Sequence, residues 1–529
     1  MLVGMVPTRK YRLILSLLIT SALWAAPPET PRKPRLVLAI IIDQFRYDYL
    51  LRFWNEYHSG LASLLEKGAV FTDAHYLHAA TVTAVGHSTF LSGAPPSISG
   101  IVGNSWYERE TGTTVTSVSD PGTKLVGGKP DAVGYSPRRL LVSTEPDEVK
   151  MQGVESKTIG VSIKDRAAIL PAGHMADGAY WYDNGSNDWV TSTYYRRELP
   201  DWAQKINAEH PAQRFAGAKW LPFDAKDGSA KPFCTMTRGT DVRYCGEIEA
   251  TPWANEMIEE FAEKAMVGEN LGHHSGVDFL TVSFSANDYV GHAVGPDDPA
   301  VRDISIRTDI LLGKLFDFVE KQAGAGNTLI VLSADHGVAP VPEVNQARHM
   351  PGGRLDGRQV AARISSALAE RFGTGEWIVP GSPANMPYLN LKLVSSLKLN
   401  LADVERVAAA AAAGVDHIAR VYTAQDLATG AVQQDAISRA FTLSFYGPRS
   451  GDLFLLQEPY YMFDASGTTH GVPYTYDNHV PVIFFGPEIK PGIYREMIAV
   501  NDIAPTLAAL LGTSEPSGSI GRVLTELFQ

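Results

Sequence analysis

Cysteine is almost absent from this 529-residue sequence, which contains only Cys234 and Cys245. Two cysteines without a nearby histidine argue against a cysteine-based metal site. In an exported chain, a disulfide bond closing the short loop between them is the favoured interpretation. Two free thiols are the alternative.

Positive charge is also in deficit. The chain has 46 lysines and arginines against 58 acidic residues, which gives a net charge of −12. A surface of that sign argues against nucleic acid as a partner. It does not exclude a small phosphate-bearing substrate, because the charge of a pocket can oppose that of the whole molecule.

Long hydrophobic runs are missing as well. The apolar stretch at residues 13–26 has 14 residues, too few to span a bilayer comfortably. It follows the basic residues 9–12, and the pair predicts a signal peptide over residues 1–26. We therefore expect a periplasmic or secreted protein without stable membrane association after cleavage. An uncleaved anchor stays open, because no clean cleavage motif is visible.

Three continuous apolar runs, at residues 35–43, 277–285 and 327–335, are typical of strands buried on both faces of a parallel sheet. Helical patterns at residues 60–68 and 303–321 alternate with them. Heptads, solenoid repeats and long low-complexity tracts are absent from the sequence. These features predict an α/β fold with a central, mostly parallel sheet flanked by helices.

Residues 27–529 are predicted to form one catalytic domain with two cap insertions. The first, at about 105–276, is rich in glycine, tyrosine, tryptophan and polar residues and is expected to cap one end of the sheet. It contains a strand at 157–163 that delivers Lys164 and Arg166, and a helix at 251–265. The second, at about 347–451, has its own helices, including one at 403–413.

Thr83 lies within the segment 78–93, where a β-like run gives way to a helical pattern ending at Gly93. A hydroxyl at such a helix start faces unpaired N–H groups and suits an anion. A threonine becomes a nucleophile only when a base or a metal activates it. Taken alone, Thr83 is more simply interpreted as a helix cap.

Histidines and carboxylates follow the predicted strands. Since sites in open α/β sheets form beyond the carboxyl ends of strands, we expect these side chains to meet. Each one alone has an ordinary structural explanation, as a cap or a packed histidine. Mixed Asp/His ligation suits Zn²⁺, and two such ions would clamp an in-line phosphoryl displacement. The candidates are Asp43, Asp288, His292, Asp335, His336 and His470.

The motifs together resemble the alkaline phosphatase superfamily, in the branch of the nucleotide pyrophosphatase/phosphodiesterases. The sequence is most similar to its phosphate-irrepressible, PafA-type alkaline phosphatases, over nearly the whole mature chain. The motifs that carry the resemblance are Asp43, Thr83-Ala-Val-Gly-His87, Gly103-Asn104, Lys164-Asp-Arg166, Asp288-Tyr-Val-Gly-His292, Ala334-Asp335-His336-Gly337 and Thr469-His470-Gly471.

The resemblance implies two zinc ions and a phosphothreonine intermediate at Thr83. His470 is favoured over His479 by its spacing and its His-Gly context. His87, His273 and His274 are left as structural. The implied ligands are Asp43, Thr83, Asp335 and His336 for one zinc and Asp288, His292 and His470 for the other, while Asn104, Lys164 and Arg166 bind the phosphoryl oxygens.

The resulting hypothesis is an exported two-zinc alkaline phosphatase that hydrolyses small phosphate monoesters. One alternative is a phosphodiesterase or nucleotide pyrophosphatase on the same two-metal site; Lys164 and Arg166 favour the doubly charged monoester. Another is a non-catalytic metal- or phosphate-binding protein. A phosphoglycerate mutase or a sulfatase is a weaker match; the sulfatase-like run from Cys234 to Arg238 lacks the proline of that motif.

Overall fold

The computed structural model describes residues 1, 4, 33–226, 229–236 and 247–528. The predicted signal peptide lies almost wholly outside these residues, as does Cys245, so the disulfide bond stays a prediction. Cys234 is buried in β12 (Cys234–Thr235). Of the helices in the described part of the chain, none is both long enough and apolar enough to cross a membrane.

A single large sheet organises residues 33–529. In the described residues it has eleven strands, and the five in the middle run parallel, because β1 pairs with β13 and β14, and β8 with β13 and β9. In order across the sheet they are β20 (Gly492–Tyr494), β2 (Ala69–Phe71), β19 (Val482–Phe485), β14 (Thr328–Ser333), β1 (Leu36–Ile42), β13 (Asp278–Phe284), β8 (Thr158–Ser162), β9 (Gly178–Asp183), β10 (Asp188–Ser192), β6 (Ser119–Val126) and β7 (Val133–Tyr135).

The register of the central strands brings their carboxyl ends to one level. Ile42 at the end of β1 pairs with Phe284 at the end of β13, and Ile41 pairs with Ser333 at the end of β14. All residues of β1 and β13 are buried, as their unbroken apolar sequences predict. The residues that follow these strands therefore meet at one edge of the sheet.

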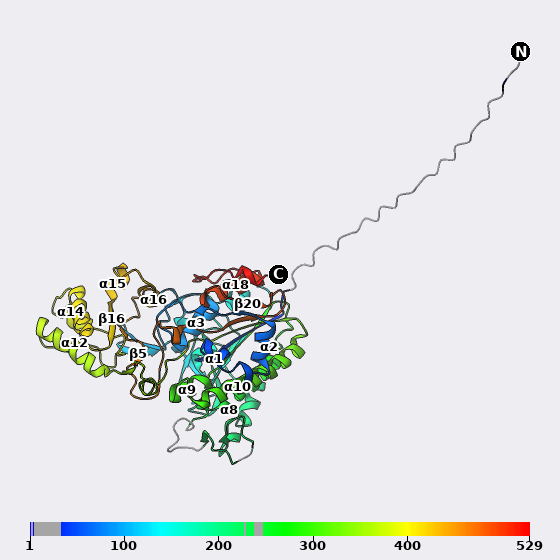
Figure 1. The fold of residues 1–529 in the computed structure, drawn as a ribbon, viewed down its shortest axis with the longest axis horizontal. Coiled ribbons are helices and arrows are strands. Elements are labelled where there is room, and N and C mark those ends of the chain that lie inside the picture. The colour runs from blue at the N-terminus through cyan, green and yellow to red at the C-terminus, as the bar shows by residue number, and fades with distance from the viewer. Residues whose placement is uncertain (2–3, 5–32, 227–228, 237–246, 529) are drawn as a thin grey trace. The chain divides into compact units, whose positions relative to one another are not determined.

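Helices cover both faces of this sheet, and the predicted α/β class is confirmed. Figure 1 shows α3 and α18 on one side of the sheet and α8 and α10 on the other. Gly60 lets α2 approach α10 closely, since a Cβ there would lie 2.4 Å from Leu312 Cβ. The helices of these layers are α2 (Gly60–Lys67), α3 (Thr83–Ser92), α5 (Glu145–Met151), α6 (Asp165–Ile169), α8 (Pro252–Gly268), α9 (Ala286–Val294), α10 (Pro299–Ala323) and α18 (Ile503–Leu511).

The region expected to cap the sheet, 105–276, also builds it. Strands β6 to β10 come from this region and extend one half of the sheet, with β8 in its parallel centre. The expected helix at 251–265 is α8. Thr251 is its N-cap residue, but the side chain makes no capping hydrogen bond, because its hydroxyl donates to the Ile248 carbonyl. The insertion boundaries themselves stay a prediction.

Residues 353–457 contain elements with hydrophobic cores of their own. Antiparallel strands β16 and β17 pack against α14, which in turn packs on α12 around Leu368 and Val404. The elements of this part are β15 (Gly353–Arg354), α12 (Gly357–Phe372), α13 (Leu391–Ser396), α14 (Leu401–Ala413), β16 (Ile418–Thr423), α15 (Ala424–Thr429), α16 (Ala436–Ser444) and β17 (Leu453–Gln457).

The remaining elements are short. They include α1 (Tyr47–Arg52), β3 (Ala74–His75), α4 (Pro96–Ser99), β4 (Ser105–Glu108), β5 (Thr113–Thr116), α7 (Asp201–Ala208), β11 (Lys219–Trp220), α11 (Pro342–Ala347), β18 (Tyr461–Met462), α17 (Thr475–Asn478) and β21 (Ile498–Ala499).

Candidate active site and metal centre

Three fully buried side chains meet where β1 and β14 end. Asp43 follows β1, and Asp335 and His336 follow β14; all have a relative exposure of 0%. His336 Nε2 lies 3.3 Å from Asp335 Oδ2 and 3.6 Å from Asp43 Oδ1. These three atoms have no hydrogen-bond partner in the described structure. Buried polar atoms without partners are rare, and three that converge fit a shared cation.

The electrostatics of this buried group point the same way. Burial, with Asp335 nearby, raises the pKa of Asp43 well above its ordinary value, and burial raises that of Asp335 to about 7. Burial lowers the pKa of His336 well below its ordinary value. Without an added positive charge the carboxylates are poorly solvated, whereas a divalent cation would stabilise both and use the neutral histidine.

A second group lies beside the first. Asp288 and His292 are one turn apart on α9, and His470 comes from a distant loop. His292 Nε2 lies 3.2 Å from Asp288 Oδ1 and 3.2 Å from His470 Nε2, which is itself 3.6 Å from Asp288 Oδ1. His336 and His470 stack with ring centroids 3.5 Å apart, which joins the two groups.

Backbone carbonyls fix how the second pair of histidines points. His292 Nδ1 donates to the Thr468 carbonyl at 2.8 Å, and His470 Nδ1 donates to the Thr81 carbonyl at 2.7 Å. Both Nε2 atoms then face Asp288. This is how histidine ligands of metal ions are usually held. Burial alone would lower the pKa of His292, but Asp288 raises it to about 9.

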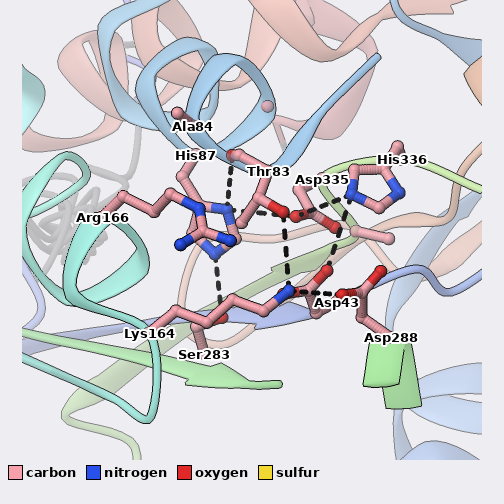
Figure 2. Close-up of polar contacts among 12 residues, drawn as sticks. Asp43, Thr83, Ala84, His87, Lys164, Arg166, Ser283, Asp288, Asp335 and His336 are labelled. Atoms are coloured by element: carbon pink, nitrogen blue, oxygen red, sulfur yellow. Dashed lines mark hydrogen bonds and ion pairs between the residues drawn. The ribbon is translucent and has the colours of Figure 1, made fainter. Parts of the chain in front are cut away.

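Lys164 lies between the two groups. Its Nζ is 2.6 Å from Asp43 Oδ2 and 2.6 Å from Asp288 Oδ2, and 3.5 Å from Thr83 Oγ1 (Figure 2). Burial opposes the charge of this ammonium, yet Asp288 and Asp43 raise its pKa above the ordinary value. A buried cation beside the threonine hydroxyl is therefore a fixed property of the site.

Thr83 is the first residue of α3, as the sequence predicts, and the helix ends at Gly93 with a left-handed φ of 65°. The hydroxyl-bearing residue is 2% exposed. His87 Nδ1 donates to the Thr83 carbonyl at 2.9 Å, and His87 Nε2 accepts from Ser283 Oγ at 2.8 Å. Burial lowers the pKa of His87 to about 4, so it holds the helix start as a neutral ring. Its structural assignment agrees with these contacts.

Gly86 lets α3 touch the end of β14. A Cβ on this residue would lie 2.2 Å from the Asp335 carbonyl oxygen and 2.6 Å from Asp335 Cβ. Any side chain would therefore push the helix away from the sheet edge. The distance from the Thr83 helix to Asp335 is set by this backbone contact.

Asn104 and Arg166 complete the neighbourhood of Thr83. Asn104 Oδ1 accepts a hydrogen bond of 2.8 Å from the Ala84 backbone, which leaves its amide N–H₂ to donate elsewhere. Arg166 lies on α6, directly after Lys164 and Asp165, and its Nε has no hydrogen-bond partner in the described structure. Its guanidinium contacts Asp165 Oδ1 at 3.5 Å. Figure 2 shows Lys164 and Arg166 reaching from the same segment.

Gln44 is a site residue that the sequence did not reveal. It is 1% exposed, has a left-handed φ of 58°, donates from its backbone to Asp335 Oδ1 at 3.0 Å, and donates from Nε2 to Asp288 Oδ1 at 2.6 Å. It thus connects both groups. Its position directly after Asp43 was the only available signal.

His479 lies elsewhere. Its ring stacks on His75, and with Asp73 the two histidines form a separate cluster. His470 rather than His479 is thus the histidine beside Asp288 and His292.

A cavity of about 220 Å³ adjoins Asn104 and is lined mainly by apolar residues, among them Val82, Met386 and Phe454.

Comparisons with known proteins identify the family of the chain. The family described as type I phosphodiesterase / nucleotide pyrophosphatase matches residues 37–479. Alkaline phosphatase PafA of Elizabethkingia meningoseptica is 34% identical over 98% of this chain and 99% of the relative. Alkaline phosphatase PhoV of Synechococcus elongatus is also 34% identical, over 95% and 94% of the two chains.

A solved structure is similar to this chain in its three-dimensional fold as well. Wild-type PafA superposes with a TM-score of 0.85 at 32% identity, over 94% of this chain and 100% of that chain. A PafA variant with one threonine, one asparagine, one lysine and one arginine replaced gives a TM-score of 0.86. The chain belongs to the type I phosphodiesterase / nucleotide pyrophosphatase family, with the fold of alkaline phosphatase PafA. The expected family and fold are confirmed, and the chain is a hydrolase of phosphoric esters.

Proposed function

We propose that this chain is an exported two-zinc alkaline phosphatase that hydrolyses phosphate monoesters through a phosphothreonine at Thr83. One observation carries the proposal: the Thr83 hydroxyl lies 3.5 Å from the buried Lys164 ammonium, which itself contacts one carboxylate of each metal-ligand group, Asp43 and Asp288. The names of the relatives PafA and PhoV support monoester hydrolysis.

Two zinc ions suit the donor atoms. Asp43, Asp335 and His336 would hold one ion together with Thr83, and a second would take the Asp288 group, with His292 and His470. Carboxylate and imidazole ligands favour Zn²⁺ over Mg²⁺ or Ca²⁺, which take oxygen ligands. When bound, the ions supply positive charge at the attacking and leaving oxygens.

The chain's own residues supply the nucleophile and the groups that bind the phosphoryl oxygens. Thr83 Oγ forms a bond to phosphorus while the ester P–O bond breaks and the alcohol leaves; water then cleaves the phosphothreonine to release phosphate. Asn104, with its amide N–H₂ free to donate, Lys164 and Arg166 would bind the non-bridging oxygens, where negative charge is concentrated. The solved PafA variant, altered at these same four residue types, agrees with this assignment.

Monoester selectivity rests on the two cations. A monoester presents an oxygen without a substituent, which rewards the Lys164 charge and the planar Arg166 fork. In a diester that oxygen carries a second group. Lys164→Ala and Arg166→Ala are each expected to lower monoester kcat/KM by roughly 10²–10³-fold, with a far smaller loss for a matched diester.

The measurement is kcat/KM for a monoester and a diester with the same leaving group, on metal-loaded protein. Lys157→Ala is the matched control, because it removes a lysine that precedes β8, at the opposite end of the strand from Lys164, and that pairs with Glu269. Equal losses on both substrates would make Lys164 and Arg166 a general phosphate clamp. The phosphodiesterase alternative, which the family description favours, would then take precedence.

A non-catalytic binding protein is the less favoured alternative, because the nucleophile and every ligand type are present. Zero turnover by fully metal-loaded protein on both substrates would support it. Export rests on residues 1–26 alone and is tested by the N-terminal sequence of the protein recovered outside the cytoplasm.

A further inference from the structure

A third cluster of metal-ligand side chains lies outside both catalytic groups. Asp73 is in the turn between β2 and β3, His75 is in β3, and His479 follows α17. One ligand atom from each lies within 4.8 Å of the others. The cluster shares no residue with the Asp43 group or the Asp288 group, and the proposed reaction does not use it.

The backbone holds the two histidines side by side. His75 and His479 face each other in an antiparallel bridge. On either side of it, the Tyr76 N–H donates to the Asn478 carbonyl at 3.0 Å and the Val480 N–H donates to the Ala74 carbonyl at 3.1 Å. The backbone therefore holds the two residues beside each other, and their rings stack with centroids 4.6 Å apart.

His75 presents one ring nitrogen to the carboxylate of Asp73. Its Nδ1 donates to Asn478 Oδ1 at 3.1 Å, so Nε2 faces Asp73 Oδ1 at 2.7 Å. Two lone pairs repel at that separation, so either a proton or a metal ion must mediate the contact. Asn478 fixes the ring in the orientation in which Nε2 points at the carboxylate.

His479 is ready to bind as a neutral ligand. Its Nε2 donates to the Thr72 carbonyl at 3.0 Å, which leaves the lone pair on Nδ1. The side chains of Asp73 and His75 are 45% and 20% exposed, which leaves room for water ligands.

The same pattern occurs within this chain in the Asp288 group. There too one aspartate meets two histidines, and His292 Nε2 faces the carboxylate at 3.2 Å while its Nδ1 bonds to an oxygen acceptor. The likeness is one of ligand type and of the histidine–carboxylate contact; the rings of His292 and His470 are tilted by 43°, whereas those of His75 and His479 stack at 17°. It holds whether or not the proposed phosphatase activity does.

We propose that Asp73, His75 and His479 form a third divalent-metal site, for Zn²⁺ or a similar ion, separate from the catalytic pair. One carboxylate, two imidazoles and water match the tetrahedral preference of Zn²⁺.

The site would also tie down the loop that carries His470. Asp477 Oδ2 accepts from the backbones of Gly471 and Val472 at 2.8 and 3.1 Å, which braces the loop from its start to Asn478 and His479. An ion bound by His75 and His479 joins the far end of this loop to the β2–β3 turn. It is therefore a structural ion for the loop.

The test counts ions in the full chain. Metal-free protein is loaded with Co²⁺, dialysed, and its bound cobalt is measured per chain for the wild type, His75→Gln and Asp73→Asn. His417→Gln is the control, because His417 makes a similar pair with Glu458 (Nδ1–Oε2 2.9 Å) on the surface without a third ligand. Circular dichroism checks that each variant is folded.

We expect His75→Gln and Asp73→Asn to bind one Co²⁺ fewer than the wild type and His417→Gln, and to unfold at a lower temperature than either, because the loop that carries His470 loses its ion. Equal cobalt in all four proteins overturns the proposal, as does an equal loss in His417→Gln. If His75→Gln fails to fold, the Asp73→Asn count decides. A wild type with a single ion that Asp73→Asn removes would support this site while contradicting the catalytic pair.

Discussion

The two candidate metal-ligand groups differ in how the chain builds them. Asp43, Asp335 and His336 follow adjacent strands and have no exposed surface, whereas the side chain of His292 is 37% exposed on a helix and His470 comes from a loop. Strand register fixes the first group; helix and loop packing fix the second. The buried group is therefore suited to hold and activate the nucleophile, and the open group to admit substrate and exchange its ion.

Metal removal should have the largest effect and should separate the two groups by the rate at which each loses its ion. A strong chelator is expected to abolish turnover, and Zn²⁺ to restore it with about two catalytic ions per chain. The open group should lose its ion at least about ten-fold faster, a barrier difference of ~1.4 kcal/mol. The check is a time course of bound zinc alongside activity. Full turnover in rigorously metal-free protein would contradict the two-metal site.

Thr83→Ala tests whether the reaction starts at the buried group. His87 joins Thr83 to that group, since its Nδ1 contacts both the Thr83 carbonyl and, at 3.2 Å, Asp335 Oδ2. We expect kcat to fall by at least about 10³-fold without loss of fold, as for other enzymes that lose a nucleophile. Thr83→Ser is the control and should retain most activity. A near-normal rate for Thr83→Ala would assign attack to another group.

Gln44→Ala probes the link between the groups. The change removes the 2.6 Å bond to Asp288 but leaves the backbone bond to Asp335 in place. Metal affinity of the open group should weaken roughly 10–100-fold, with the buried group little affected, because residues that orient ligands have effects of that size. Competition with a chelator of known affinity measures both. Equal weakening at both groups would show that Gln44 does not distinguish them.

Glu145→Gln should change stability and leave the metal groups alone. Burial raises the pKa of Glu145 to about 9, so the folded state keeps a proton that the unfolded state loses above about pH 4.5. The free energy of unfolding should therefore fall as pH rises from 6 to 8, by about 1–3 kcal/mol, and the variant should lack this fall. Urea unfolding at both pH values measures it. A changed order of metal release in this variant would mean that global stability, not exposure, sets the order.

The strand-end residues could be predicted because their signal is local. Asp43 and Asp335 each end an unbroken apolar run, and the carboxyl ends of parallel strands share an edge. The helix start at Thr83 and the left-handed Gly93 followed from local pattern in the same way. The assignment of these side chains as ligands and catalytic residues stays a prediction.

Other features depended on contacts between distant segments. Spacing and context in the sequence favoured His470 over His479, and the fold separates the two by stacking one on His336 and the other on His75. Gln44 carried no motif, since its role follows from a left-handed backbone turn. Strands β6, β7 and β10 escaped prediction as parts of the main sheet because they run antiparallel, and because β6 and β10 are rich in polar residues, a pattern equally typical of loops.

The contact at Gly86 has a consequence for how the enzyme tolerates change. Because the backbone of Gly86 contacts the backbone of Asp335, no rotatable side-chain bond lies between α3 and Asp335, and their separation is fixed. Volume changes in the surrounding hydrophobic core can be absorbed by side-chain repacking without altering that gap. A methyl group at position 86 cannot be absorbed in this way. One of the smallest possible substitutions would therefore displace Thr83 from Asp335 while most of the core remained as it was.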